Sequence, residues 1–448
     1  MKIYRICAAV VPAIAFAAVS ISTLAGPATA MEIRKIVSDK GIVAWFVPDK
    51  SVPMLAMSFA FRNAGSATDP DGKEGLAEMA SSLLDEGAGE LKSQNFQRAL
   101  EDIAAQMSFG AGRDTFTGRL RTLTAERGKA FDLLRLALNA PRFDDQPVQR
   151  IRSQILASLR RSIDNPRRIS GQLWSKTIFP GHPYSKLSNG SEKTVGTLSV
   201  ADLRAFVRDR FTRDRLIVGV VGDITEQELK TRLDSVFGDL PATGPKFEIP
   251  ETKPAGSGKT LIVRKQIPQS VVILGHGGIK RDDPDWYKAL LVTRVFGGGG
   301  LSSRLYEEIR EKRGLAYSVY AYLSPMQHSG IIAGGVATQN ARAAESVSVI
   351  RAEWKKLAEK GITAKELATA KTYLNGSFPL RLGSSRGIAG MLVGIQIADL
   401  GMDYIEKRPS LINSITLAEA NRVARRLFRA DDLTVIVVGD PKEMEEKP

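Results

Sequence analysis

Residues 75–86, GLAEMASSLLDE, place three polar side chains where one face of a helix could do metal chemistry. They are Glu78, Ser81 and Ser82, at relative positions i, i+3 and i+4 of a segment with helical apolar spacing. The inverted zinc motif H-x-x-E-H uses this spacing to hold zinc between two imidazoles, with a carboxylate between them as general base. Histidine stands at none of the three positions, so a two-histidine zinc site cannot form. We therefore predict that the chain does not hydrolyse peptides alone.

A second pair of residues, Arg310 and Tyr317, stands seven residues apart within EEIREKRGLAYSVY. A guanidinium offers forked hydrogen-bond donors to an oxygen acceptor, and a phenol hydroxyl can donate to the same acceptor. The spacing predicts a helix that ends at Gly314 and a strand that begins near Leu315, so both side chains can face one cleft. From the residues alone, an arginine on a charged helix and a tyrosine in a strand remains the simpler interpretation.

The elements that position these residues belong to two similar halves. TLSVADLRAFVRDRFTRDRLIVGVVGDI (197–224) matches SITLAEANRVARRLFRADDLTVIVVGDP (414–441) without a gap, at an offset of 217 residues and with ten of 28 positions identical. Each copy predicts a helix followed by a buried strand that ends at Gly-Asp. The sequence therefore predicts two homologous domains.

Residues 241–258, PATGPKFEIPETKPAGSG, are rich in Pro, Gly and Lys and lack apolar periodicity, which is typical of a linker. We place an N-terminal domain at 31–240, the linker at 241–258 and a C-terminal domain at 259–448. Predicted strands are Ile42–Val47, Leu55–Phe61, Thr260–Val263 and Ser270–Leu274, and predicted helices are Ser93–Met107, Gln146–Ile163, Pro284–Phe296 and Ala364–Asn375. Strands and helices do not alternate strictly, so we predict an α+β fold with mostly antiparallel sheets packed with helices.

The start of the chain predicts export. Residues 1–30 carry Lys2 and Arg5, then the apolar run Ala8–Ala18, then Ala28-Thr29-Ala30 as a small-residue cleavage site. This pattern is typical of a signal peptide cleaved near Ala30, because the apolar run is too short for a membrane span. We expect a periplasmic or secreted protein with no membrane span after cleavage; an uncleaved anchor is the alternative.

Composition limits the classes of function. The only cysteine, Cys7, lies in the predicted signal peptide, so the mature chain would have no disulfide and no cysteine-based metal site or nucleophile. The formal charge of +14 falls to +12 when Lys2 and Arg5 are removed, a balance that favours acidic partners or anionic surfaces. No run of Lys and Arg is interleaved with aromatic residues, so we do not predict nucleic-acid binding.

Three blocks together resemble the pitrilysin/insulinase-like zinc metallopeptidases: NAGSATDPDGKEGLAEM (63–79), FPGHPYSK (179–186) and GGGGLSSRLYEEIREKRGLAYSVYAY (297–322). The resemblance covers nearly the whole mature chain and is nearest to the smaller, processing-peptidase-like branch, whose chains hold two homologous domains. It implies that the chain forms half of a clamshell around a chamber where peptides are bound and cut. In this branch the second half comes from another chain.

The resemblance also implies which functions are lost. The family's His, Glu and His positions are occupied by Glu78, Ser81 and Ser82, and its third zinc ligand, a Glu, falls at Ser158. Serine is not a usual zinc ligand, so we predict neither a metal site nor a catalytic group in this chain. Zinc is expected in a partner subunit.

Two substrate contacts of the family are present. The resemblance assigns binding of the substrate backbone to Arg310 and Tyr317, and addition of the peptide to an exposed strand at Met107–Asp114. From the residues alone, that segment could equally be an ordinary inner strand or a bulge that contains glycine.

These features predict a non-catalytic, substrate-binding subunit of a heterodimeric periplasmic zinc metallopeptidase, with an H-x-x-E-H homologue as partner and peptide as substrate. One alternative is a stand-alone pseudopeptidase that binds peptides or scaffolds a complex as a homodimer. Another is a hydrolase that uses an unrecognised site.

Overall fold

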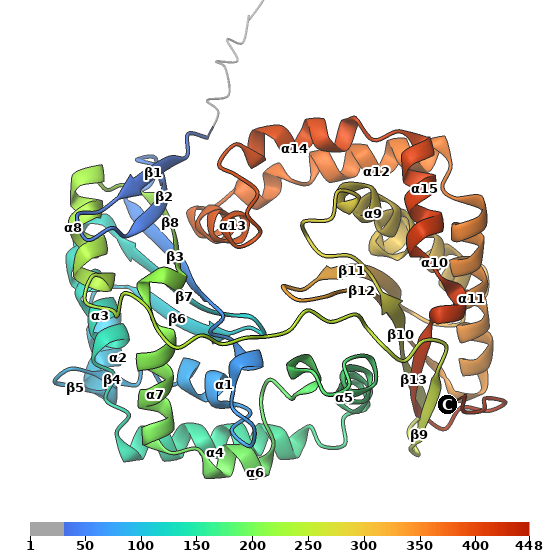
Figure 1. Ribbon diagram of the computed structural model, residues 1–448, viewed down its shortest axis with the longest axis horizontal. Helices are drawn as coiled ribbons and strands as arrows, with labels where there is room; N and C mark the ends of the chain where they lie inside the picture. Colours follow the sequence, from blue (N-terminus) through green and yellow to red (C-terminus); the bar gives the residue numbers. More distant parts are fainter. Residues whose placement is uncertain (1–30, 448) are drawn as a thin grey trace, which may run out of the picture. The chain divides into compact units, whose positions relative to one another are not determined.

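Two sheets organise the chain, one built from each half of the sequence (Figure 1). The computed structural model describes residues 31–447, so the predicted signal peptide, with Cys7, lies outside the described residues. The first sheet has the order β1-β2-β8-β3-β7-β6 and the second the order β11-β12-β10-β13-β9. Bounds in the first sheet are β1 Arg34–Val37, β2 Val43–Pro48, β3 Met54–Arg62, β6 Gln106–Ala111, β7 Thr115–Leu123 and β8 Leu216–Gly222. In the second they are β9 Thr260–Arg264, β10 Gln269–Gly277, β11 Val319–Pro325, β12 Gly330–Gln339 and β13 Thr434–Gly439.

The two sheets share one pairing pattern. The pairs β2–β8 and β9–β13 are parallel, and the other pairs of both sheets are antiparallel. A separate two-stranded ladder joins β4 (Gly87–Ala88) to β5 (Leu91–Lys92). The predicted α+β fold of two homologous, mostly antiparallel halves is therefore confirmed.

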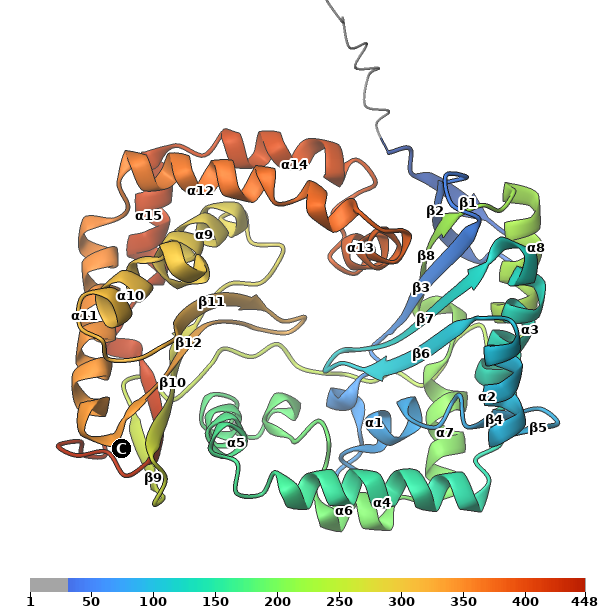
Figure 2. The ribbon, with the colours of Figure 1, turned by 180° about the vertical axis from the view of Figure 1, so that it is seen from behind.

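Helices cover these sheets in both halves, as Figure 2 shows from behind. Those of the first half are α1 Leu76–Ser81, α2 Ser93–Asp102, α3 Arg127–Asn139, α4 Asp145–Arg161, α5 Pro166–Ile178, α6 Glu192–Thr197, α7 Val200–Arg210 and α8 Glu226–Phe237. Those of the second are α9 Trp286–Thr293, α10 Arg304–Tyr306, α11 Ala343–Lys360, α12 Ala364–Gly376, α13 Ser385–Ile397, α14 Tyr404–Asn413 and α15 Leu417–Leu427. Within residues 31–447, every helix is too short or too polar to cross a membrane.

The repeated segment folds twice into the same unit. Helices α7 and α15 begin and end 217 residues apart, and each starts with a capping box, at Ser199 and Thr416. In each case the cap hydroxyl accepts a hydrogen bond from the third helical N–H, while an acidic side chain accepts one from the cap N–H. The strands that follow take equivalent places in the two sheets. β8 lies between its parallel neighbour β2 and its antiparallel neighbour β3, and β13 lies between its parallel neighbour β9 and its antiparallel neighbour β10.

Two helices are exchanged between the halves. Helix α5 packs on β10 and β13 of the second sheet, and α13 packs on β3 and β8 of the first; both views show the exchange. A Cβ on Gly219 of β8 would lie 2.7 Å from the carbonyl oxygen of Ala389 in α13, so only glycine allows this close approach. The chain from Ile33 onward is accordingly one compact unit, and the boundaries at 240 and 258 stay predictions.

The predicted helix Ser93–Met107 is wrong in its last turn. Helix α2 ends at Asp102, because Ala104 has φ +49° and the chain enters β6 at Gln106. The apolar residues that suggested a longer helix are shared between a helix end and the start of a strand.

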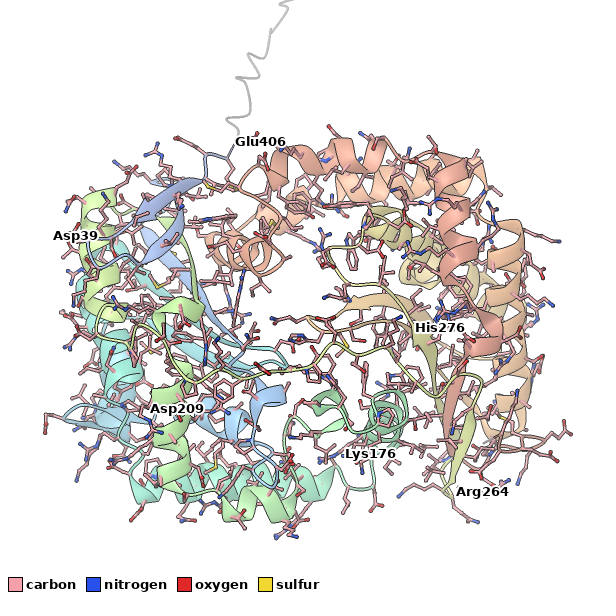
Figure 3. All side chains as sticks on the ribbon, viewed as in Figure 1. Asp39, Lys176, Asp209, Arg264, His276 and Glu406 are labelled. Carbon is pink, nitrogen blue, oxygen red and sulfur yellow. The ribbon has the colours of Figure 1, made fainter. Side chains whose placement is uncertain are left out.

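His276 of β10 is a buried neutral side chain in the second half, labelled in Figure 3. Its Nε2 accepts a hydrogen bond from Trp354 Nε1 at 3.0 Å, and its Nδ1 lies 2.8 Å from the carbonyl oxygen of Gly277. Burial, and to a lesser extent the positive charge of Arg429, lowers the pKa of His276 from 6.5 to about 4.

We expect stability to fall as pH drops from about 6.5 toward 4, because the unfolded imidazole takes up a proton that the folded one refuses. The free energy of unfolding in urea should decrease by about 1.4 kcal/mol per pH unit from this group. His276→Gln, which cannot be protonated, should show a correspondingly shallower dependence between pH 7 and pH 4.5. Equal slopes for both proteins would contradict a neutral buried His276.

Candidate functional site

Helix α1, which carries the three positions of the degenerate zinc motif, is held at its start by Asp69. The carboxylate of Asp69 accepts hydrogen bonds from the backbone N–H of Gly75 at 3.1 Å and of Ala77 at 3.2 Å. Burial raises the pKa of Asp69 to about 7, against the opposing charge of Arg210 and these backbone donors. The helix keeps an acidic N-terminal partner although it carries no zinc ligand.

The two serines of the motif serve their own helix. Ser81 Oγ and Ser82 Oγ both donate to the carbonyl oxygen of Glu78, at 2.8 Å and 3.1 Å. Because both hydroxyls donate to that carbonyl oxygen, they add hydrogen bonds to the last turn of α1. They therefore stabilise the helix end where a zinc enzyme would present a base and a ligand.

Glu78 and Ser158 correspond to metal-ligand positions of the family. Both line one cavity of about 460 Å³. Burial raises the pKa of Glu78, and its carboxylate has no hydrogen-bond or ion-pair partner within residues 31–447. In the same part of the chain, no three His, Cys, Asp or Glu side chains are grouped to hold a metal ion.

Arg310 and Tyr317 meet as the spacing predicts. The guanidinium carbon of Arg310 lies 4.6 Å from the ring centroid of Tyr317 and 4.9 Å from that of Tyr306. Arg310 also donates to the Tyr306 hydroxyl. Two aromatic rings thus fix the guanidinium, while the Tyr317 side chain is 81% exposed and free to touch a ligand.

The backbone around this pair differs from the prediction. The helix is a short α10 followed by a π-type turn over Glu307–Glu311, and β11 begins at Val319 rather than near Leu315. The π-type turn brings the backbone N–H of Lys312 to the carbonyl oxygen of Glu307 at 2.9 Å. Such single turns widen a helix and redirect its side chains.

The Arg310–Tyr317 pair is separate from the cavity of Glu78 and Ser158. Neither residue of the pair lines that cavity. Tyr317 lies just before β11, an edge strand of the second sheet, whereas the cavity lies between α1, α4 and α5. The pair and the cavity lining therefore share no residue.

Strand β6, which covers most of the predicted peptide-binding segment Met107–Asp114, is an edge strand of the first sheet. It pairs only with β7, and residues 106–111 make no other backbone hydrogen bond within the described chain. An unpaired strand edge can accept another extended peptide through its N–H and C=O groups. The inner-strand alternative is therefore excluded by the sheet order.

Tyr184 joins the tips of two hairpins, a role that sequence reasoning missed. Its hydroxyl donates to Asp114 Oδ1 at 2.7 Å, next to the turn between β6 and β7, and accepts from the backbone N–H of His328 at 3.1 Å, in the turn between β11 and β12. The backbone N–H of Gln327 donates to Asp114 Oδ2 at 3.3 Å, and Arg113 Nη1 donates to the Tyr184 carbonyl oxygen at 2.8 Å. The halves are thus bonded to each other at this point.

The block FPGHPYSK owes its composition to this junction. His182 caps the short helical turn that holds Tyr184: its Nδ1 accepts from the Tyr184 backbone N–H at 3.1 Å, and its Nε2 lies 2.9 Å from the carbonyl oxygen of Pro250. The tyrosine ring is fully buried beside Phe179. The local sequence carries no signal for this junction. It becomes visible only in the structure, as a buried tyrosine whose hydroxyl and backbone groups both form hydrogen bonds.

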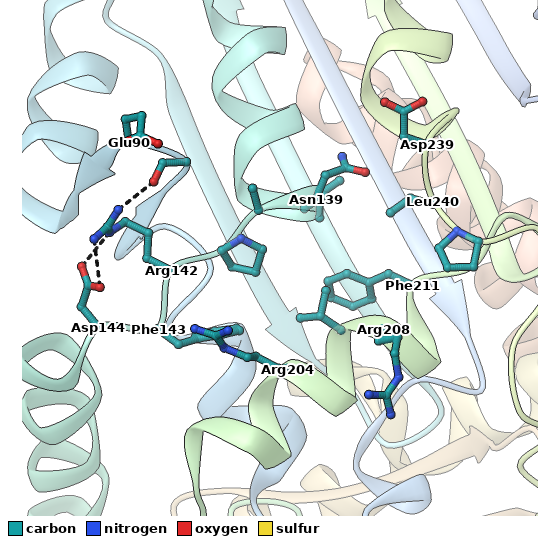
Figure 4. Close-up of a pocket in the computed structure, with 16 residues that line it drawn as sticks. Glu90, Asn139, Arg142, Phe143, Asp144, Arg204, Arg208, Phe211, Asp239 and Leu240 are labelled. Atoms are coloured by element: carbon teal, nitrogen blue, oxygen red, sulfur yellow. Dashed lines mark hydrogen bonds and ion pairs between the residues drawn. The ribbon is translucent and has the colours of Figure 1, made fainter.

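A further hollow lies in the first half, and none of the site residues described above lines it (Figure 4). It measures about 610 Å³ and is lined by the ends of α3 and α7 and the segments 139–144 and 239–241. Arg142, which lines it, donates to Asp144 at 2.7 Å and to the carbonyl oxygen of Gly89 at 2.8 Å. It holds no pair of groups arranged for acid, base or nucleophilic chemistry.

Comparison with known proteins agrees with this geometry. Residues 197–374 match a family model described as the peptidase M16 inactive domain. A Helicobacter pylori protein named "Non-peptidase homolog YmxG" is 26% identical over 393 residues, which are 88% of this chain and 90% of that protein. A Bacillus subtilis protein named "Uncharacterized zinc protease YmxG" is 25% identical over 376 residues, covering 82% of this chain and 89% of that protein.

The likeness extends to solved structures. The peptidase M16 inactive domain from Pseudomonas fluorescens superposes with a TM-score of 0.85 at 26% identity, over 93% of this chain and 100% of that one. The fold of this chain therefore matches that of a solved structure described as a peptidase M16 inactive domain.

Proposed function

Because this chain belongs to the pitrilysin-like M16 peptidase family as an inactive member, we propose that it is the non-catalytic, substrate-binding subunit of a heterodimeric zinc metallopeptidase. A homologous chain with an intact H-x-x-E-H motif supplies the zinc ion and the general base. This chain supplies Arg310 and Tyr317 to the partner's site. The predicted signal peptide supports a periplasmic location for the assembly.

The separation within this chain carries the proposal. Arg310 and Tyr317 are paired and accessible, yet they lie apart from the cavity of Glu78 and Ser158, which itself lacks metal ligands. A pair of residues that contacts the substrate backbone can contribute to hydrolysis only where a zinc site faces it. A second chain, facing this one across a shared chamber, provides such a site.

The edge strand β6 allows this chain to bind the peptide by itself. Backbone hydrogen bonds along the edge need no metal ligand, so they survive the loss of the zinc motif. The tip of the β6–β7 hairpin is braced by the bond from Tyr184 to Asp114. A rigid edge loses little conformational entropy when a peptide is added to it.

The experiment is co-expression of the mature chain with an exported H-x-x-E-H homologue from the same genome. We expect a stable one-to-one complex by light scattering, and a rate of fluorogenic-peptide hydrolysis at least tenfold above that of the homologue alone. This chain alone should be inactive, because its zinc-ligand positions are occupied by Glu78, Ser82 and Ser158 and its general-base position by Ser81.

Two results would count against the heterodimer. Full activity of the homologue alone, with no complex formed, would remove any need for this subunit. A homodimer that binds peptide without hydrolysis would instead favour a stand-alone pseudopeptidase. Activity of the isolated chain after removal of metal would reveal an unrecognised site.

A further inference from the structure

Most of the charged side chains that line the cavity at the position of the family's zinc site are basic. It lies between α1, α4 and α5, and both ribbon views show α1 and α5 on the same side of α4. Its lining includes four cations, Arg113, Arg167, Arg168 and Lys186, and a single carboxylate, Glu78. A surplus of positive charge opposes a metal ion and attracts an anion.

Two of these cations stand at the start of α5 without an acidic partner. Arg167 and Arg168 form no ion pair within residues 31–447. The Arg168 side chain donates to the hydroxyl of Ser162, a neutral acceptor that leaves its charge uncompensated. Asn165 already caps the helix by accepting from both backbone N–H groups, so the two guanidiniums are not needed for capping.

The third guanidinium enters from the hairpin of the edge strand. Arg113 follows β6 by two residues and bonds only the carbonyl oxygen of Tyr184, with its guanidinium 5.3 Å from the centroid of that ring. It also has no ion pair within the described chain. Lys186, by contrast, is neutralised by Asp71 at 2.6 Å.

The cavity has room for a ligand group. At about 460 Å³ it is within the range of small-ligand sites, roughly 300–1,000 Å³. Gly171, inside α5, lines it, and a Cβ added there would meet nothing within 4 Å. Glycine in a helix interior costs about 1 kcal/mol relative to alanine, and here it widens the space in front of the arginines.

We propose that this cavity binds a carboxylate of the peptide that lies along β6. The inference rests on the proposed peptide-binding function and names its substrate class: peptides with an acidic side chain or a free C-terminus at the β6–β7 turn. The end of β6 leads directly to Arg113, and guanidiniums match the fork of a carboxylate. Where active relatives would polarise a peptide bond, this chain would hold an anionic part of the substrate.

The test uses the mature chain and a set of peptides carrying a neutral fluorophore at the N-terminus. The core sequence is Thr-Val-Thr-Val-Thr, followed by Glu-Glu or Gln-Gln, each made as a free acid and as a C-terminal amide. Fluorescence anisotropy gives the Kd. We expect the most acidic peptide to bind about tenfold or more tightly than the neutral one, with an advantage that shrinks between 50 and 500 mM salt.

Three variants locate the effect. Arg167→Gln/Arg168→Gln should remove the preference for acid while leaving the Kd of the neutral peptide unchanged. Arg160→Gln/Arg161→Gln removes the same charge from α4 outside the cavity lining and should keep the preference. Gly171→Leu fills the cavity without changing charge and should remove the preference too. Circular dichroism checks that each variant is folded.

The outcomes separate this inference from the function on which it rests. Equal binding of acidic and neutral peptides to the wild type overturns the carboxylate site and leaves peptide binding intact. If the Arg160→Gln/Arg161→Gln variant loses the preference for acidic peptides to the same extent, the carboxylate site is also overturned. The overall positive charge of the protein would then explain the preference. Failure of every peptide to bind overturns both. The free-acid and amide arms tell whether a side chain or the C-terminus is bound.

Discussion

We expect Arg310→Ala to lower kcat/KM of the assembled complex about 100-fold, with most of the loss in kcat. The guanidinium is fixed between the rings of Tyr306 and Tyr317, so its donors are oriented before substrate arrives. Preoriented donors act mainly on charge that develops in the transition state, and removing one costs about 2.7–4 kcal/mol. Tyr317→Phe removes only an exposed hydroxyl and should lower kcat with little change in KM.

Arg313→Ala is the matched control, since it removes an equal charge three residues away. Arg313 is paired with Glu308 and donates to its carbonyl oxygen at 2.8 Å, so its loss should cost a surface ion pair of about 1 kcal/mol or less. Assembly of each variant complex is measured by size-exclusion chromatography. Unchanged hydrolysis in an intact Arg310→Ala complex would sink the shared-site proposal. Arg310→Lys, which keeps charge but loses the planar fork, should behave like alanine.

Local patterns predicted the repeated core well. The segments 200–210 and 417–427 have helical spacing, and the apolar runs after them can only be buried strands, so both halves were recognisable. The exchange of α5 and α13 between the sheets was not predictable. Periodicity shows that a helix has an apolar face but not which sheet receives it, and both sheets here offer a surface of small and branched residues.

The candidate site was predictable in its residue types and not in its electrostatics. The motif spacing located Glu78, the family resemblance pointed to Ser158, and the structure places both on one cavity. The basic character of that cavity comes from Arg167 and Arg168. In the sequence these residues follow a helix cap in DNPRRIS and look like ordinary solvent-exposed residues. Only the structure shows that they line a cavity together with α4, without acidic partners within residues 31–447.

The junction at Tyr184 supports the other large effect, on stability. We expect Tyr184→Ala to lower the free energy of unfolding by about 3–5 kcal/mol, because it leaves a cavity at a fully buried aromatic position. Tyr184→Phe should cost about 1–2 kcal/mol through the lost bonds to Asp114 and His328. Urea denaturation of the mature chain measures both values.

Hydrogen exchange then shows where the loss acts. In Tyr184→Phe the ring packing remains, so added exchange should be confined to the two hairpin tips, at 112–114 and 326–329. Phe179→Leu is a core control that keeps both hydroxyl bonds and should leave the tips protected. Because the β6 edge ends at one of these tips, loosening it should also weaken peptide binding. If the tips stay protected in Tyr184→Phe, the bond from Tyr184 does not brace the edge strand, and the hold on peptide must come from the sheet alone.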